Sequence, residues 1–174
     1  MTEAVLAAPE SSVEAYRINF EESARSSNEP AWLKELRRSA MGNFERLDFP
    51  TMKDEDWHFT NVGPIAEKVF VPARAGGEVP KEVIDRLALG QDSTRIVFVN
   101  GRLVSGAEQG ELPDGLTVVN LAQEIDADSQ LLQRHLGKLA MSESAAFTAL
   151  NTALATDGAV IVITANTVID KPVH

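Results

Sequence analysis

The sequence contains no cysteine. This absence excludes disulfide bonds, thiolate nucleophiles and cysteine-ligated clusters within the segment. Long apolar runs are also missing, since none approaches the roughly 20 residues that a membrane-spanning helix needs. The N-terminus has no basic region and carries an early acid, Glu3, which is unlike a secretory signal peptide. We therefore expect a cytoplasmic protein with no membrane partner.

Positive charge is scarce, because 16 Lys and Arg residues face 26 Asp and Glu residues and leave a net charge of −10. After Arg102 the Lys and Arg residues are Arg134, Lys138 and Lys171. A chain of this charge should repel nucleic acid and anionic lipid, so we expect neither as a partner. We interpret the acidity as a source of solubility rather than as a docking face.

Apolar residues make up 44% of the 174 residues, an ordinary share for a protein with a core. The length suits one domain, or one domain with a fragment of another. The residue periodicities predict an α+β fold, with a helical N-terminal part and a smaller mixed α/β part that contains a β-hairpin. Gly76-Gly77 lacks the strand–glycine–helix order of a phosphate-binding loop, so we expect no nucleotide site there.

Two antiparallel helices are predicted near the N-terminus, after a mobile tail at residues 1–10. Ser11 and Glu14 have the spacing of a capping box at the start of the first helix. Pro30 suits the first turn of the second. The inward residues predicted for the first helix are Val13, Tyr16, Phe20 and Ala24, and those for the second are Trp32, Leu33, Leu36, Ala40, Phe44 and Leu47, with Lys34, Arg37, Arg38 and Arg46 outside.

The second half of the chain alternates strand and helix signals. Asn100-Gly101 between two β-rich segments predicts a hairpin with a type I′ turn. Further strands are predicted at residues 68–72, 116–120, 160–163 and 168–169. A helix opened by Pro80 has Val83, Ile84 and Leu87 inward and ends at Gly90; one capped by Asp128 or Ser129 ends at Gly137; and one capped by Ser142 carries the stripe Phe147, Leu150 and Leu154.

The stretch from Phe49 to Asn61 joins these parts and holds the candidate binding residues. Thr51 is expected to cap a short helical turn whose first residues are acidic. Trp57 and Phe59 supply apolar side chains to that turn, and either could equally belong to the core. We predict that this is a docking segment, in which Trp57, His58 and Phe59 contact a partner if their rings are exposed.

Metal or catalytic chemistry has little support in the sequence. Asp54 and His58 are four residues apart and would share one face of a helix, where they could hold a metal. A metal site needs three or four ligands, however, and His135 and His174 are distant in sequence. We therefore assign no catalytic, metal or cofactor-binding residue. A small metal-dependent hydrolase that uses Asp54 and His58 is one alternative, and a free-standing protein-interaction domain is another.

Four motifs occur in the order found in one known family. The first is Phe-Pro-Thr-x-Lys-x-Glu-x-Trp-x-aromatic-Thr-Asn at residues 49–61, and the second is the hairpin Val-Phe-Val-Asn-Gly at residues 97–101. The third is Phe147 to Ala153 followed by Asp157-Gly158, and the fourth is the apolar segment that leads to Pro172-Val173-His174. Together they resemble the N-terminal region of the SufB/SufD family of iron–sulfur cluster assembly proteins, and its SufD-like members in particular. His58 departs from the Lys or Arg that the family often has there.

The resemblance implies a non-enzymatic scaffold subunit of the SufBCD complex, with SufB and the ATPase SufC as partners through the full-length protein. It also implies that residues 11–158 form an N-terminal α+β domain. Residues 159–174 would then begin a right-handed parallel β-helix that is cut off, with residues 160–163 buried on both faces. The cluster-related residues and the ATPase contact would lie outside this segment, so an iron–sulfur cluster is implied for the whole complex only. We accordingly expect the natural chain to continue past His174.

Overall fold

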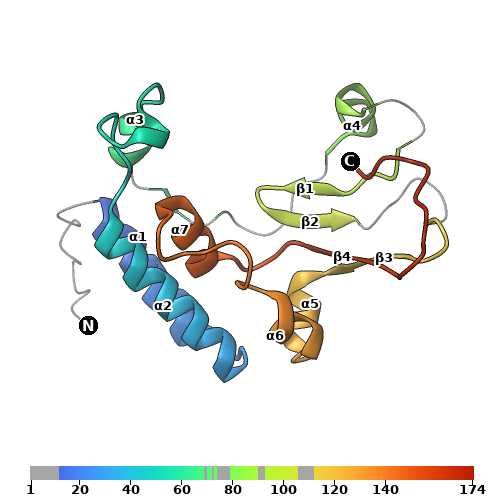
Figure 1. The fold of residues 1–174 in the computed structure, drawn as a ribbon, viewed down its shortest axis with the longest axis horizontal. Helices are drawn as coiled ribbons and strands as arrows, with labels where there is room; N and C mark the ends of the chain where they lie inside the picture. Colours follow the sequence, from blue (N-terminus) through green and yellow to red (C-terminus); the bar gives the residue numbers. More distant parts are fainter. Residues whose placement is uncertain (1–11, 69, 72, 74–78, 90–92, 106–111) are drawn as a thin grey trace, which may run out of the picture. The chain divides into compact units, whose positions relative to one another are not determined.

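The computed structural model describes residues 12–68, 70–71, 73, 79–89, 93–105 and 112–174. No helix in these ranges is long and apolar enough to cross a membrane. The chain divides into two compact units, Met1–Pro72 with Gln130–Leu154, and Ala73–Ser129 with Ala155–His174. The helices and strands of both units are labelled in Figure 1.

The first unit is helical. The predicted N-terminal helices are confirmed as α1 (Ser12–Ser26) and α2 (Ala31–Leu47), whereas Ser11 of the proposed capping box lies outside the described residues. The described residues of the unit also form the helices α3 (Gly63–Ala66), α6 (Gln130–His135) and α7 (Ala146–Leu154) and a 3₁₀ turn, η1 (Glu55–Trp57). Helix α3 was not predicted, although Pro64 stands in its first turn, where proline is favoured.

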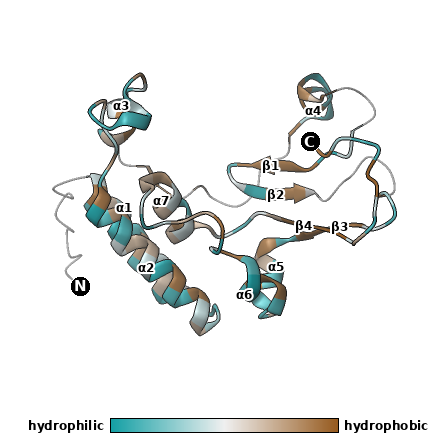
Figure 2. Cartoon of the chain, viewed as in Figure 1, coloured by the Kyte–Doolittle hydropathy of each residue, from teal (hydrophilic) through white to brown (hydrophobic). Residues whose placement is uncertain are grey.

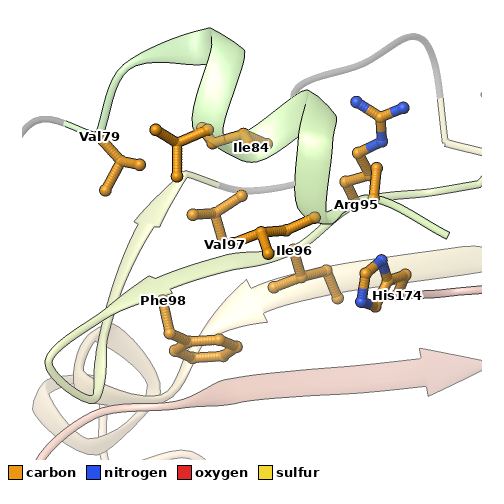
Figure 3. A pocket seen from close by; sticks show the side chains of 10 residues that line it. Val79, Ile84, Arg95, Ile96, Val97, Phe98 and His174 are labelled. Atoms are coloured by element: carbon orange, nitrogen blue, oxygen red, sulfur yellow. The ribbon is translucent and has the colours of Figure 1, made fainter.

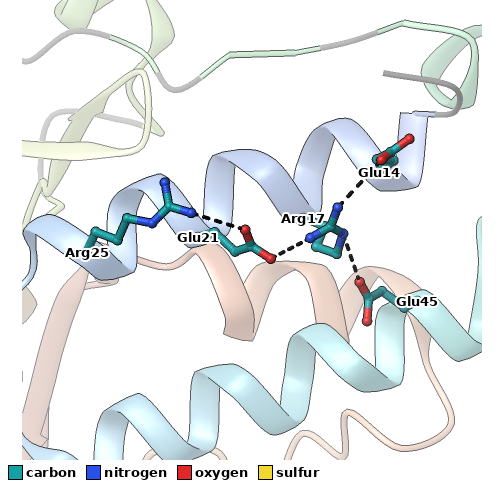
Figure 4. A network of polar contacts seen from close by, with 5 residues as sticks. All are labelled: Glu14, Arg17, Glu21, Arg25 and Glu45. Atoms are coloured by element: carbon teal, nitrogen blue, oxygen red, sulfur yellow. Dashed lines mark hydrogen bonds and ion pairs between the residues drawn. The ribbon is translucent and has the colours of Figure 1, made fainter. Parts of the chain in front are cut away.

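Helices α1 and α2 run antiparallel, as predicted. Tyr16, near the start of α1, packs edge-on against Phe44, near the end of α2, with ring centroids 6.0 Å apart. On the surface, Arg17 of α1 pairs with Glu45 of α2 at 3.7 Å and with Glu21 of its own helix (Figure 4). These ion pairs are partly exposed and so contribute little stability; the aromatic contact is the stronger reason for the arrangement.

Helix α7 packs closely against α2, and alanines make this possible. Ala149 and Ala153 of α7 and Ala40 of α2 are completely buried, and short side chains allow two helix backbones to approach. The predicted stripe Phe147, Leu150 and Leu154 is only partly buried against the same core.

Ser142 was predicted to cap this helix, and that prediction is wrong. It is buried ahead of the helix, where its hydroxyl accepts a hydrogen bond from the Asn43 side chain at 3.1 Å. The helix itself begins four residues later, at Ala146.

Arg37 is buried, and the prediction that it lies outside is wrong. Its spacing from Leu33 and Met41 places it on the inner face of α2. The guanidinium forms an ion pair with the buried carboxylate of Glu29, and its Nε donates to the carbonyl of Ala153 at 2.8 Å. A charge can be buried there because a partner charge and a hydrogen-bond acceptor surround it.

The second unit contains two small antiparallel sheets. The predicted hairpin is confirmed as β1 (Val97–Val99) and β2 (Arg102–Ser105), and Asn100 and Gly101 have the positive φ values, 51° and 77°, that a type I′ turn requires. Strand β3 (Leu116–Asn120) pairs with β4 (Ala159–Ile163), from Leu116 opposite Ile163 to Asn120 opposite Ala159.

Helix α4 (Lys81–Leu87) begins after Pro80 as predicted. Leu87 is mostly exposed rather than inward, and Gly90 lies outside the described residues. Helix α5 (Leu121–Asp126) was not predicted; its N-terminus is capped by the Asn120 side chain, which accepts from the Gln123 amide at 3.0 Å. Asn120 and Gln123 have the capping-box spacing that would have revealed this helix.

Asp157 connects the two sheets of this unit. Its carboxylate accepts hydrogen bonds from the amide of Leu103 in β2 at 3.0 Å, from the Asn120 side chain at 2.9 Å and from the Gly158 amide at 2.7 Å. A Cβ on Gly158 would lie 3.2 Å from a methyl group of Leu121, a tight contact. The Asp-Gly pair thus fastens the hairpin to the start of β4.

Strand β4 does not have the predicted burial. Figure 2 shows it as hydrophobic along its length, yet Ile161 and Ile163 are exposed, because no second layer covers this face among the described residues. Val168 and Ile169 form no strand, and Val173 instead makes a parallel bridge with Thr94. The predicted entry into a β-helix is therefore not seen in the described part of the chain.

The strand predicted at residues 68–72 is also wrong where it can be tested. Lys68, Phe70 and Val71 are not in a strand, and Val69 and Pro72 lie outside the described residues. Phe70 instead uses its carbonyl to accept a hydrogen bond from the Asn19 side chain of α1 at 3.1 Å.

Replacing Ala149 by Leu should test the close contact between α2 and α7. The added methylenes have no space at a completely buried position, so we expect a loss of about 1–3 kcal/mol in the free energy of unfolding. Urea denaturation followed by tryptophan fluorescence measures it. The exposed Asn151→Leu on the same helix is the control and should change stability by less than about 0.5 kcal/mol. Equal stability of the two variants would contradict the packing.

Replacing Glu29 by Gln should test the buried ion pair. The charge of Arg37 would lose its partner, and we expect destabilisation of about 3–5 kcal/mol. The matched control is Glu35→Gln, which breaks the exposed Glu35–Arg38 pair and should cost no more than about 0.5 kcal/mol. Thermal and urea unfolding measure both effects. A Glu29 variant as stable as the Glu35 variant would show that Arg37 is solvated.

Candidate functional site

The stretch from Phe49 to Asn61 is held to the first unit by a row of aromatic rings. Phe44 of α2 contacts the buried Phe49 with centroids 5.2 Å apart, and Phe49 contacts Phe147 of α7 at 5.8 Å. Trp57 also packs against Phe147, with ring centroids 5.2 Å apart. Edge-to-face and tilted contacts of this kind add stability beyond the area they bury. Trp57 is therefore partly core and anchors the segment.

A hydrogen-bonded turn precedes Trp57. The Asp54 carboxylate accepts from the Thr51 amide at 2.7 Å and from the Thr51 hydroxyl at 3.0 Å. These two bonds stabilise the ionised form and hold the pKa of Asp54 below its ordinary value. Thr51 was predicted to cap the helical turn that follows it. Its hydroxyl does accept from the Lys53 amide, and its carbonyl accepts from the Asp54 amide at 3.0 Å, so it caps the turn of residues 51–54, whereas the N-cap of the 3₁₀ turn η1 is Asp54.

His58 and Phe59 are exposed, and neither ring has a recorded contact with the aromatic row among the described residues. The Nδ1 atom of His58 lies 3.1 Å from the carbonyl oxygen of Met52, so the tautomer protonated at Nδ1 donates this hydrogen bond. The ring of His58 packs edge-on against that of Phe59 with centroids 4.8 Å apart. Phe59 is otherwise uncovered in the described part of the chain, with 97% of its surface exposed. The three predicted contact residues are thus divided into one anchor and two exposed rings.

Asp54 and His58 do not share a helix face, contrary to the premise of the metal-site alternative. Asp54 has extended backbone angles and stands before a 3₁₀ turn of three residues, Glu55–Trp57. The side chain of Asp54 is committed to Thr51, and that of His58 to Met52. Over the described ranges, no group of three or more His, Cys, Asp or Glu residues has the geometry to hold a metal ion.

A second exposed apolar position was missed from the sequence. Leu139, between α6 and α7, has 94% of its surface exposed, and Met141 of the same loop is also exposed. The signal was available, since both residues follow the helix-ending Gly137, whose φ is 68°, and precede the start of α7. Unlike Phe59, which follows Trp57 by two residues, Leu139 lies in a segment, residues 136–145, that contains no aromatic residue.

Comparisons with known proteins agree on one family. The sequence model of the family described as the SufBD protein N-terminal region matches residues 10–174. An iron–sulfur cluster assembly SufBD family protein of Synechocystis is 29% identical over 158 residues, which cover 88% of this chain and 34% of that protein. The iron–sulfur cluster assembly protein SufD of Escherichia coli is 41% identical over 59 residues, 34% of this chain and 14% of that protein.

The chain therefore spans about a third or less of the length of these curated relatives. The family match, by contrast, extends over nearly the whole chain and includes all four motifs noted in the sequence, from Phe49 to His174. With the helical first unit, the aromatic anchor and the hairpin in place, the chain belongs to the SufBD family and corresponds to its N-terminal region.

Proposed function

We propose that this chain is the N-terminal part of a SufD-like subunit that acts with SufB and the ATPase SufC in iron–sulfur cluster assembly. The family match supports this, as do the names of both relatives, which are iron–sulfur cluster assembly proteins. The role proposed for the segment is structural and cytoplasmic, without catalysis. It offers no cysteine to a cluster, so a cluster of the complex would need thiolate ligands from elsewhere.

Within that role we assign a partner contact to Phe59 and His58, supported by Trp57. The observation that carries this is the nearly complete exposure of a phenylalanine whose segment is fixed by an aromatic row. An aromatic side chain has few rotatable bonds to order on binding, and aromatic residues are frequent hot spots of interfaces.

The charge beside Phe59 indicates the chemistry of the partner surface. Glu55 and Asp56 precede it in the same turn and are exposed, and neither forms a recorded ion pair within the described residues. We expect Phe59 to enter an apolar pocket with basic residues at its rim. Such rim charges mainly accelerate association, so the association rate should fall as salt is added.

The assignment of Phe59 can be tested with the full-length protein. We expect Phe59→Ala to weaken binding to a SufB–SufC complex about tenfold or more, the loss that a hot spot of about 1.4 kcal/mol produces. Titration calorimetry or interferometry measures this. Thermal unfolding should be unchanged, because the side chain makes few contacts within its own chain.

Leu139→Ala is the matched control, since it removes an equally exposed apolar side chain from another loop of the first unit. It should bind as the unchanged protein does. Equal binding by both variants would refute the contact at Phe59 alone. Failure of the unchanged full-length protein to co-purify with SufB and SufC would refute the complex, and would favour an interaction domain outside cluster assembly.

A further inference from the structure

The backbone just before β1, at Thr94 and Ile96, is already hydrogen-bonded along one edge to the segment from Pro172 to His174. Thr94 donates its amide to the carbonyl of Pro172 at 2.9 Å, and its own carbonyl accepts from the amide of His174 at 2.8 Å. The amide of Ile96 then donates to the carbonyl of His174, again at 2.8 Å. With Val173 bridged to Thr94 in parallel, these bonds form the start of a parallel ladder.

The ladder stops while the edge of β1 continues. Backbone groups alternate along a strand, so Phe98 presents its amide to the same edge as Thr94 and Ile96. The irregularity between Val97 and Phe98 does not alter this, because the extra residue lies in β2. Within the described ranges no backbone partner is recorded for the Ile96 carbonyl, and β2 is the only strand that pairs with β1.

An apolar pocket of about 360 Å³ opens beside this edge. Figure 3 shows it between α4, which supplies Val83 and Ile84, and β1, with Arg95 and His174 at one end. Arg95 is bonded to Asp85 at 2.7 Å, so its charge is balanced within the unit. The remaining lining is largely aliphatic, and such a surface favours an apolar side chain over a charged one.

We propose that the residues directly following His174 in the full-length protein extend the parallel ladder along β1 and close this pocket. The second residue after His174 donates its amide to the Ile96 carbonyl and accepts from the Phe98 amide, continuing the register of the existing bonds. Its side chain leaves on the same face as those of His174 and Val97, both of which line the pocket. That residue is therefore apolar.

A segment of the same chain is favoured over a separate peptide or a second copy. The matched family region is an N-terminal one, and both relatives are more than twice as long as this chain, so further chain follows this region in them. His174 is already bonded beside the open edge, and the next residues are thereby held there at high effective concentration. This pairing does not depend on SufB or SufC, so the proposed complex can fail while the pairing holds.

A cysteine pair in the full-length protein tests the register. Phe98→Cys is combined with a cysteine at the third residue after His174, which faces position 98 directly. Neighbouring strands lie about 4.8 Å apart, within the Cα separation of about 4.4–6.8 Å that a disulfide tolerates. Mild oxidation should remove both free thiols, and peptide mass spectrometry should locate the bond. This chain contributes no cysteine of its own to compete.

The control places the second cysteine one residue later, where the side chain points to the opposite face and the thiols should stay free. Cross-linking in neither pair, or equally in both, would overturn the proposal, as would a reading frame that ends at His174 or a charged second residue after it.

Amide exchange gives a second measurement on the unsubstituted protein. Phe98 should exchange as slowly as Val99, which pairs with Arg102, whereas an amide as fast as that of Gly101 in the turn would refute the pairing.

Discussion

The close contact between α2 and α7 is the constraint on which the first unit depends. Arg37 and Ala153 are 116 residues apart in sequence, yet α2 and α7 lie so close together that the Nε of Arg37 donates a hydrogen bond to the carbonyl of Ala153. Alanines at the contact make that approach possible. The same helix presents Phe147 to Phe49 and Trp57, so the position of the exposed Phe59 follows from how α7 packs.

In the second unit, hydrogen bonds connect the two sheets. One carboxylate, that of Asp157, holds the amide of Leu103, the side chain of Asn120 and the amide of Gly158. Because the first two belong to different sheets, the side chain connects the hairpin to the β3–β4 pair. The Asp-Gly pair that contributes to the family resemblance thus has a structural reason, and it needs no catalytic one.

Separating the anchor from the exposed rings required the structure. From the sequence, Trp57, His58 and Phe59 have equal standing as contact residues. The difference arises because Phe147, almost a hundred residues later, covers Trp57 and leaves Phe59 uncovered. Arg37 illustrates the same limit: it was predicted to lie outside, and only Glu29 and the end of α7 show how its charge is tolerated on the inner face.

The sequence by itself determined what is local: α1 and α2 from their apolar periodicity, the hairpin from Asn100-Gly101, and the family from the order of four motifs. These features depend on neighbouring residues and on backbone angles that few residues adopt. The tertiary structure alone decided burial and pairing. Strand β4 has the composition of a doubly covered strand, but its exposure depends on which elements lie beside it, and composition does not specify that.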